Sequence, residues 1–155
     1  MIYVFDTNTI CVLKNYYPKR FPSLWTNLNG LVGTIITSVA EVHRELDRHS
    51  AADFLDDWIK ENKGIFHKPC IAEQKIVGEI FAVPHFQNLI SQKALLEGTP
   101  VADPFVIASA KYRCGTVVTE EVLKPNAAKI PNVCGHFDIP CINLETFMDH
   151  QGWKF

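Results

Sequence analysis

Met1-Ile-Tyr-Val-Phe-Asp-Thr-Asn-Thr-Ile10 is the stretch of sequence that decides the fold. Its apolar run, Ile2 to Phe5, ends abruptly on Asp6, and this enrichment in β-branched and aromatic side chains predicts a buried strand. A carboxylate directly after such a strand lies where open α/β sheets place their ligand sites. Asp, Thr and Asn are also favoured at helix N-termini, so a cap of the next helix is the simpler interpretation of Asp6 alone.

The same arrangement recurs twice further along the chain. An apolar helix is predicted to begin beside Asp103, with Asp103 as its cap and Pro104 in the first helical position. Thr116 to Val118 form a second predicted buried strand, which leads into Glu120 and Glu121. If these acids converge at one edge of a sheet, their mutual repulsion makes the cluster costly unless a cation lies among them. Oxygen-only ligation favours Mg²⁺ or Mn²⁺.

Strands and helices alternate along the whole sequence, which predicts an α/β fold whose parallel sheet is covered on both faces. The predicted strands are residues 2–5, 34–36, 116–118 and 141–142, with a minor one near 65–66. The predicted helices are residues 9–15, 22–29, 39–48, 51–61, 71–81, 89–96, 144–150 and the helix that follows Asp103. The length of 155 residues suits a single domain over residues 1–155.

Three motifs together carry a family resemblance: Phe5-Asp6-Thr7-Asn8, the helix from Ala102 to Ala110, and Val117-Val118-Thr119-Glu120-Glu121. In this order and spacing they resemble the PIN-domain ribonucleases, which include the toxin halves of many bacterial and archaeal toxin–antitoxin pairs. The chain is most similar to an uncharacterised PIN branch that also carries the segments found here at Phe21–Trp25 and Pro131–Cys134. The resemblance implies a three-layer α/β/α PIN-like domain with a central, mainly parallel sheet.

The resemblance also implies that four acids hold one or two Mg²⁺ or Mn²⁺ ions for the hydrolysis of RNA. Asp6 and Asp103 match two of them, and Glu121 stands where the family has Asp, with a side chain one methylene longer. The fourth acid lies in the helix after the second strand. The residues expected to support or replace these acids are Asn8, Thr119 and Glu120.

Two acids of that helix, Glu41 and Glu45, lie one turn apart on the same face. Ser38-Val-Ala-Glu41 fits a capping box, which gives Glu41 a structural role. Glu45 has no capping duty, so Glu45 is the preferred site acid and Glu41 its alternative. A solvated pair of Glu45 with Arg48 or His49 is the competing interpretation.

Composition limits how the protein meets a nucleic acid. The formal net charge is −2 and the chain is 47% hydrophobic and 21% charged. Bulk positive charge is therefore not available for phosphate binding, although bound metal ions would supply it locally. The basic residues that are candidates for phosphate contacts are Arg20, Arg44, Arg48, Lys111, Arg113, Lys124 and Lys129.

The five cysteines show no Cys-x-x-Cys pair and no zinc-type spacing to histidine. Most lie in apolar stretches, which is typical of reduced, buried cysteines. The sequence shows neither a signal peptide nor an apolar segment as long as a membrane span. A cytoplasmic protein without a membrane partner is expected.

The function predicted from these patterns is a metal-dependent endoribonuclease that is the toxin of a toxin–antitoxin pair. The expected partners are RNA, an antitoxin protein and a second copy of the chain. One alternative is a PIN-like module that binds RNA or protein without cleaving. The other is a phosphoryl-transfer hydrolase with Asp6 as nucleophile. Such enzymes commonly carry a second acid two residues on, where this chain has Asn8.

Overall fold

A five-stranded sheet forms the centre of the protein, in a computed structural model that describes residues 1–99 and 101–155. Neighbouring strands pair in the order β3-β2-β1-β4-β5, and every pair is parallel. The strands are β1 (Tyr3–Phe5), β2 (Ile36–Val39), β3 (Phe66–His67), β4 (Thr116–Val118) and β5 (Cys141–Ile142).

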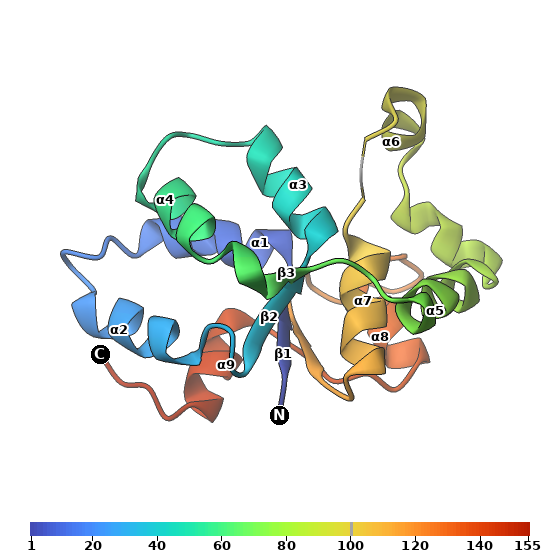
Figure 1. Ribbon diagram of the computed structural model, residues 1–155. Coiled ribbons are helices and arrows are strands. Elements are labelled where there is room, and N and C mark those ends of the chain that lie inside the picture. The colour runs from blue at the N-terminus through green and yellow to red at the C-terminus, as the bar shows by residue number, and fades with distance from the viewer. Residues whose placement is uncertain (100) are drawn as a thin grey trace.

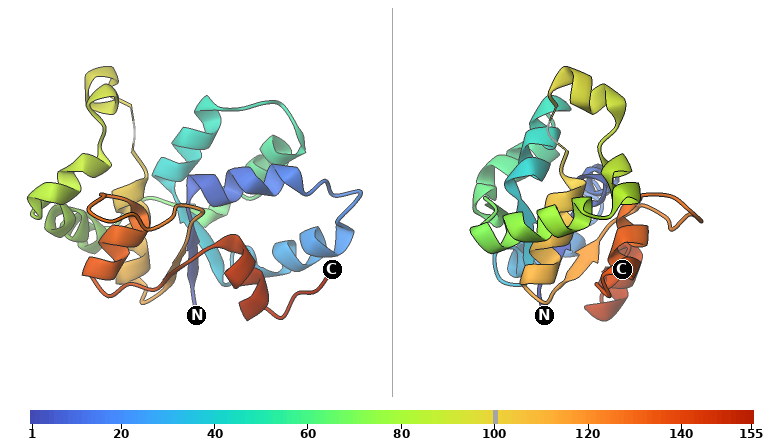
Figure 2. Two further views of the ribbon diagram at one scale, coloured as in Figure 1. Left: turned by 180° about the vertical axis from the view of Figure 1, so that it is seen from behind. Right: turned by 90° about the vertical axis from the view of Figure 1, so that its right-hand side faces the viewer.

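Helices cover both faces of this sheet, as Figures 1 and 2 show: α5, α7 and α8 lie on one side, and α1, α2, α4 and α9 on the other. The α-helices are α1 (Thr7–Val12), α2 (Pro22–Leu31), α3 (Ala40–Arg48), α4 (Phe54–Glu61), α5 (Ile71–Phe81), α6 (Gln92–Glu97), α7 (Asp103–Tyr112), α8 (Ile130–His136) and α9 (Leu144–His150). Short 3₁₀ turns are η1 (Leu13–Asn15), η2 (Lys63–Ile65) and η3 (Pro84–Leu89). The predicted three-layer α/β/α architecture is confirmed.

The two faces of the sheet are held by different kinds of contact. On one face, the Phe147 ring of α9 meets Tyr3 and Phe5 of β1 edge to face, with ring centroids 4.9 and 5.1 Å apart. On the other face, α7 packs against β1, β2 and β4 and buries Val106 and Ile107 completely. Burial of side chains this large stabilises the fold by roughly 1.5–3 kcal/mol each.

The strand order creates a natural ligand site. From β1 the chain adds β2 and β3 on one side of the sheet and then β4 and β5 on the other, so the strand order reverses between β1 and β4. Open α/β sheets bind ligands beyond the carboxyl ends of the strands at such a switch point. Phe5 pairs with Val118, so Asp6 and Thr119 leave the sheet side by side. The residues that follow β1 and β4 are therefore brought together by the topology.

The second strand lies later than predicted, at Ile36–Val39 rather than 34–36. Its polar residues are buried because tertiary partners satisfy them: the Thr37 hydroxyl donates to the Ile65 carbonyl, and the Ser38 hydroxyl donates to the Phe5 carbonyl. Ser38 is thus part of the sheet, and α3 is preceded by Val39, which makes no side-chain cap. The capping box predicted for Ser38 and Glu41 is wrong.

Several helix boundaries also differ from the prediction. The first helix begins at Thr7 because Asp6 caps it, and α4 begins at Phe54 because the Asp53 carboxylate accepts from the amides that follow it. Gly30 lies inside α2 and does not end it. The segment predicted as helix 89–96 is instead the end of η3 followed by α6. Helix α8 was not predicted at all, whereas 71–81, 116–118, 141–142 and 144–150 agree with the structure.

The two segments shared with the uncharacterised PIN branch occupy equivalent positions, each at the start of a helix with proline in its first turn. Pro22 begins α2, and Pro131 follows Ile130 at the start of α8. Proline suits this position because its missing N–H would have no helical partner there.

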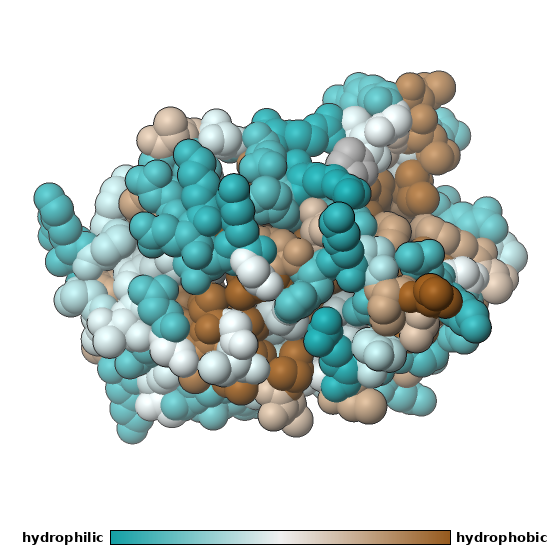
Figure 3. Space-filling view, viewed as in Figure 1, coloured by the Kyte–Doolittle hydropathy of each residue, from teal (hydrophilic) through white to brown (hydrophobic). Residues whose placement is uncertain are grey.

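Helix α6 extends away from the body of the protein (Figure 1). It buries none of its residues, and Leu95 and Leu96 are exposed, so hydrophobic surface lies on this helix in Figure 3. Among the described residues, no helix has the length and apolar character that a membrane span requires.

The cysteines are all free, but they are less buried than predicted. Cys134 is buried and Cys11 and Cys141 are half-buried, whereas Cys70 and Cys114 are exposed.

Candidate active site

Asp6 lies directly after β1, where it caps α1 and also faces the residue after β4. Its Oδ1 accepts from the Thr9 amide at 2.8 Å, and its Oδ2 accepts from the Thr119 hydroxyl at 2.6 Å. Burial raises the pKa of Asp6 to about 6, against the lowering effect of these hydrogen bonds, and the charge of Glu121 adds to the rise. The capping and site interpretations of Asp6 therefore describe one side chain that does both.

The sequence predicted Asp103 as the cap of α7, but Asp103 is the first residue of this helix. The turn begins one residue earlier, because the Ala102 carbonyl accepts from the amides of Phe105 and Val106. The cap residue Ala102 makes no side-chain capping bond, and within the part of the chain that the structure describes no hydrogen bond affects the pKa of Asp103. Helix capping, the structural role that the sequence suggested for Asp103, therefore does not explain this carboxylate.

The electrostatic setting of Asp103 shows that the acids converge. Burial, followed by the charges of Glu121, Glu45 and Asp6, raises the pKa of Asp103 to about 7, while the charge of Lys129 acts in the opposite direction. Like charges disfavour each other's ionisation when they lie close together. The acids after β1, in α3 and after β4 therefore lie near enough for their charges to act on Asp103.

Glu45 reaches this group from α3. Its Oε1 accepts from the Ala102 amide at 2.9 Å, and its Oε2 accepts from the Thr7 hydroxyl. These partners replace the solvated pair with Arg48 or His49 that the sequence allowed. Glu45 also lines a pocket of about 360 Å³, together with Asp6, Thr7, Asn8, Cys11, Arg48, His49 and Asp103.

Glu41, the alternative to Glu45, lies elsewhere. It is 6% exposed and does not line the pocket that holds Asp6, Glu45 and Asp103. Its Oε1 lies 3.8 Å from Arg44 Nη1 of the same helix, and its Oε2 has no hydrogen-bond partner among the described residues. Without a capping box, the structure gives no reason for the burial of this second oxygen.

The segment after β4 carries the remaining predicted residues. Thr119 links two of them, since its hydroxyl donates to Asp6 and accepts from the Glu121 amide at 3.1 Å. Glu121 Oε2 accepts from the Ile130 amide at the start of α8, at 2.8 Å. Glu120 Oε1 accepts from the Leu144 amide at the start of α9, also at 2.8 Å. Both glutamates therefore anchor a helix as well as facing the site.

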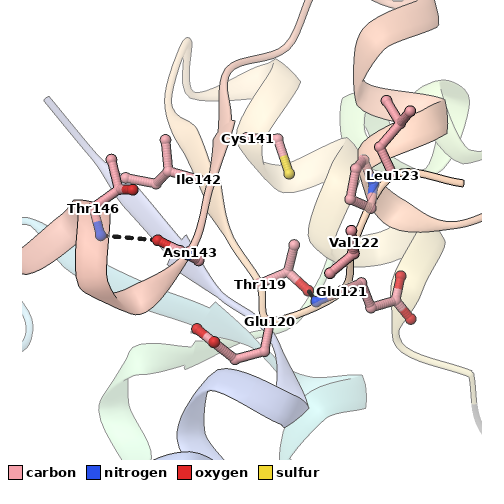
Figure 4. Close-up of a pocket in the computed structure, with 10 residues that line it drawn as sticks. Thr119, Glu120, Glu121, Val122, Leu123, Cys141, Ile142, Asn143 and Thr146 are labelled. Carbon is pink, nitrogen blue, oxygen red and sulfur yellow. Dashed lines mark hydrogen bonds between the residues drawn. The ribbon is translucent and has the colours of Figure 1, made fainter.

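Three pockets meet at this edge of the sheet. Figure 4 shows the one of about 450 Å³ between the segment after β4 and the start of α9, with Glu120 and Glu121 on its floor and Asn143 and Thr146 on its far side. A second, of about 460 Å³, shares Glu120 and Glu121 with it. This second pocket shares Asn8 with the pocket around Asp103, so it adjoins both of the others.

The donor set suits a hard divalent cation, although the side chains are turned toward protein partners. Among residues 1–99 and 101–155, no three His, Cys, Asp or Glu side chains are grouped as a metal site. Asp6, Glu45 and Glu121 instead accept hydrogen bonds from protein groups. All the atoms that could coordinate a cation are oxygens, which Mg²⁺ and Mn²⁺ prefer. Burial and then the neighbouring negative charges raise the pKa of Asp103, and a cation would relieve the repulsion between these charges.

Sequence reasoning missed two contributors to the site: the Thr7 hydroxyl and the Ala102 amide. Lys129, named from the sequence only as a candidate phosphate contact, also acts on Asp103 through its charge. Thr7 could have been found, because it follows Asp6 in the motif that carried the resemblance. The role of the Ala102 amide has no signal in the sequence, because a backbone donor depends only on where α7 begins.

The fold and the site together define the class of protein: an α/β/α PIN-like domain, as the resemblance in the sequence predicted. Over residues 3–155 the sequence matches the family described as a domain of unknown function, DUF4411, and the chain belongs to that family. No curated protein matches the chain.

Solved structures share the fold at low sequence identity. FitAcB from Neisseria gonorrhoeae is 17% identical with a TM-score of 0.55, over 92% of this chain and 97% of that one. VapBC2 from Rickettsia felis, bound to a DNA fragment from its promoter, is 18% identical with a TM-score of 0.50, over 92% and 98%. FitAB bound to an IR36 DNA fragment is 15% identical with a TM-score of 0.51, over 92% and 94%. These likenesses establish the fold.

Proposed function

We propose that this protein is a divalent-metal-dependent endoribonuclease and the toxin half of a toxin–antitoxin pair. The observation that carries the proposal is the pocket that Asp6, Glu45 and Asp103 line together. Burial and then the charges of Glu121, Glu45 and Asp6 raise the pKa of Asp103 in this pocket. Strongly perturbed acids in a cleft are typical of catalytic sites. The sequence resemblance to PIN-domain ribonucleases supplies the reaction class.

Asp6, Glu45, Asp103 and Glu121 are the residues that would hold the ion. Once bound, a divalent ion lowers the pKa of a water molecule and neutralises charge on a phosphodiester. The protein's own part is to hold the carboxylates at fixed positions: Thr119 orients Asp6, and Thr7 with the Ala102 amide orients Glu45. Mutation of supporting partners of this kind commonly lowers metal affinity or activity by about 10- to 100-fold.

An antitoxin partner is supported by two different observations. The PIN family that the sequence resembles includes the toxin halves of toxin–antitoxin pairs. Among the solved structures of similar fold are FitAcB, FitAB and VapBC2. Expression of the wild-type chain should therefore arrest bacterial growth, Asp103→Asn should not, and a small protein encoded beside it should relieve the arrest. Growth arrest by both the wild type and Asp103→Asn would show that toxicity does not depend on Asp103.

The rival hydrolase, with Asp6 as nucleophile, is disfavoured by Asn8, which stands where such enzymes commonly carry a second acid. The rival binding module is favoured by the bond between Glu121 and the Ile130 amide, which gives Glu121 a structural role. Metal binding without cleavage of RNA would establish the binding module.

Cleavage of single-stranded RNA tests the proposal directly. Purified protein should cleave with Mg²⁺ or Mn²⁺ and stop with EDTA, while Asp6→Asn and Asp103→Asn should lose activity and keep a native circular dichroism spectrum. Asp149→Asn, on the exposed face of α9, is the matched control and should cleave like the wild type. Full cleavage by both site variants would overturn the mechanism.

A further inference from the structure

A second pocket beside Asp103 is lined by lysines as well as by acids. It has a volume of about 460 Å³ and lies between α1, η1 and the segment that joins β4 to α8. We call it the lysine pocket and define it by Asn8, Lys14, Asn15, Glu120, Glu121 and Lys129. It shares Asn8 and Cys11 with the pocket around Asp103, so the two pockets are neighbours.

Ion pairs remove two of the other basic candidates from consideration. Lys111 lies 3.3 Å from Glu79 and Arg44 lies 3.8 Å from Glu41, so both have acidic partners. No such pair involves Lys129 within the described part of the chain. Its side chain is exposed at the rim of the lysine pocket, and its charge reaches Asp103.

Lys14 occupies a similar position on another element. It is exposed in η1, lines the same pocket, and its charge acts on neighbouring Cys11. Within the described residues it also has no ion-pair partner. Two ammonium groups without ion-pair partners among the described residues therefore stand at the rim of a pocket that Glu120 and Glu121 also line.

A phosphodiester matches this arrangement. Lysine is a compact point charge with three donors and no acceptor, and it commonly binds phosphate. The Asn8 and Asn15 amides offer further donors to phosphate or ribose oxygens. Contacts of these groups to phosphate oxygens would position the backbone without reading its sequence.

We propose that the lysine pocket binds the phosphodiester adjacent to the one that is cleaved, with Lys14 and Lys129 as positioning residues for the RNA backbone. The proposal rests on the proposed function, because it takes RNA as the substrate. The lysine pocket adjoins the pocket of Figure 4, with which it shares Glu120 and Glu121, so the proposed path of the strand leads from Asp103 past the lysines toward the start of α9.

The test is the salt dependence of RNA binding, measured without cleavage. Fluorescence polarisation of a labelled single-stranded RNA of mixed sequence is followed in EDTA over a range of salt. Each phosphate contact in a single strand contributes about 0.7 to the slope of log K against log salt. Lys14→Gln and Lys129→Gln should each reduce the slope by about 0.7 and weaken binding about fivefold at 0.1 M salt. The double variant should reduce the slope by about 1.4.

Matched controls separate a phosphate contact from bulk charge. Lys19→Gln and Lys124→Gln each remove one exposed positive charge from outside the lysine pocket, so they should leave the slope close to that of the wild type. Lys129→Arg keeps the charge and should restore the slope. A melting temperature for each variant shows whether it is folded.

The outcomes distinguish this inference from the proposed function. An unchanged slope in both pocket variants, an equal loss in the controls, or no RNA binding by the wild type would overturn the lysine pocket as a backbone site. A slope that depends on Lys14 and Lys129, in a protein that cleaves no RNA with any divalent ion, would support the pocket and refute the nuclease.

Discussion

Glu45 Oε1 accepts a hydrogen bond from the Ala102 amide, 2.9 Å away, although the two residues are 57 positions apart in the chain. This bond joins α3 to the first turn of α7, directly beside Asp103. Because Glu45 Oε2 accepts from Thr7, the same carboxylate also contacts the start of α1, directly after Asp6. Glu45 therefore connects the two elements that carry the aspartates.

Replacing Glu45 and Glu41 one at a time should show which acid of α3 belongs to the site. Glu45→Gln should reduce RNA cleavage at least about tenfold, as loss of a metal ligand or of its support commonly does. Glu41→Gln should leave cleavage close to that of the wild type, because Glu41 does not line the pocket around Asp103. Initial rates at saturating Mn²⁺ are the measurement. The reverse result would place the site acid one turn earlier in the helix.

Thr119 provides a second test, because it supports Asp6 without carrying charge. Thr119→Val removes a buried hydroxyl that donates to Asp6 and accepts from the Glu121 amide. Loss of a buried partner commonly costs about 1–3 kcal/mol, so the free energy of unfolding should fall by that amount.

Cleavage by Thr119→Val should fall too, since Asp6 loses the donor that orients it. Thr119→Ser keeps the hydroxyl and should retain most of the stability and activity. Chemical denaturation and a cleavage assay measure the two effects. If Ser and Val behave alike, the methyl group matters more than the hydrogen bond.

The sequence predicted the layers and the acids because both depend on local patterns. Continuous apolar runs identified β1 and β4, and a parallel sheet then places the residues after its strands at one edge. Asp6 and Glu121 could be named for that reason, and Asp103 from the start of the apolar helix and the motif that carries the resemblance. Their convergence around Asp103 agrees with the pattern, and their roles in catalysis stay predictions.

The errors arose where tertiary partners overrode local signals. Thr37 and Ser38 looked too polar for a buried strand, yet carbonyls of Ile65 and Phe5 accept their hydroxyl protons. Helix α8 was missed because Pro131 and Gly135 are unfavourable inside helices, although proline is suitable in a first turn. Glu45 was preferred because a capping box was expected for Glu41, and that reason proved wrong even though Glu45 lines the pocket.

Two glycines should respond in opposite ways to alanine. A Cβ at Gly115 would lie 2.6 Å from the Ile2 carbonyl oxygen, where backbone pairs β1 with β4, so Gly115→Ala should destabilise the fold by about 1–3 kcal/mol. Gly78 lies inside α5 with no atom within 4 Å of the added Cβ, so Gly78→Ala should stabilise it by roughly 0.5–1 kcal/mol. Urea denaturation measures both. A stable Gly115→Ala protein would show that the start of β4 can shift.

The raised pKa of Asp103 predicts how the stability of metal-free protein depends on pH. The value rises from 3.8 to about 7 in the folded state, so the folded chain binds this proton more tightly than the unfolded chain. Stability from this group is complete below about pH 4 and is lost as pH rises through about 7.

The loss should amount to a few kcal/mol in the wild type and should be absent in Asp103→Asn. The measurement is the difference in free energy of unfolding between the two proteins, in EDTA, across this pH range. A constant difference would show that Asp103 ionises as easily in the folded protein as in the unfolded chain.

Divalent metal should reverse the destabilisation at neutral pH. An ion that binds only the folded state adds RT ln(1 + [L]/Kd) to its stability, about 2.7 kcal/mol when the ion is at 100 times Kd. For a domain of this size, the melting temperature of the wild type should then rise by several degrees.

Asp103→Asn should melt at or above the wild type in EDTA, because one repelling charge is gone, and should gain little from Mn²⁺. Since Ala102 and not Asp103 is the cap of α7, this substitution should not weaken the start of the helix. Equal melting temperatures for the wild type with EDTA and with millimolar Mn²⁺ would show that Asp6, Glu45, Asp103 and Glu121 do not form a metal site.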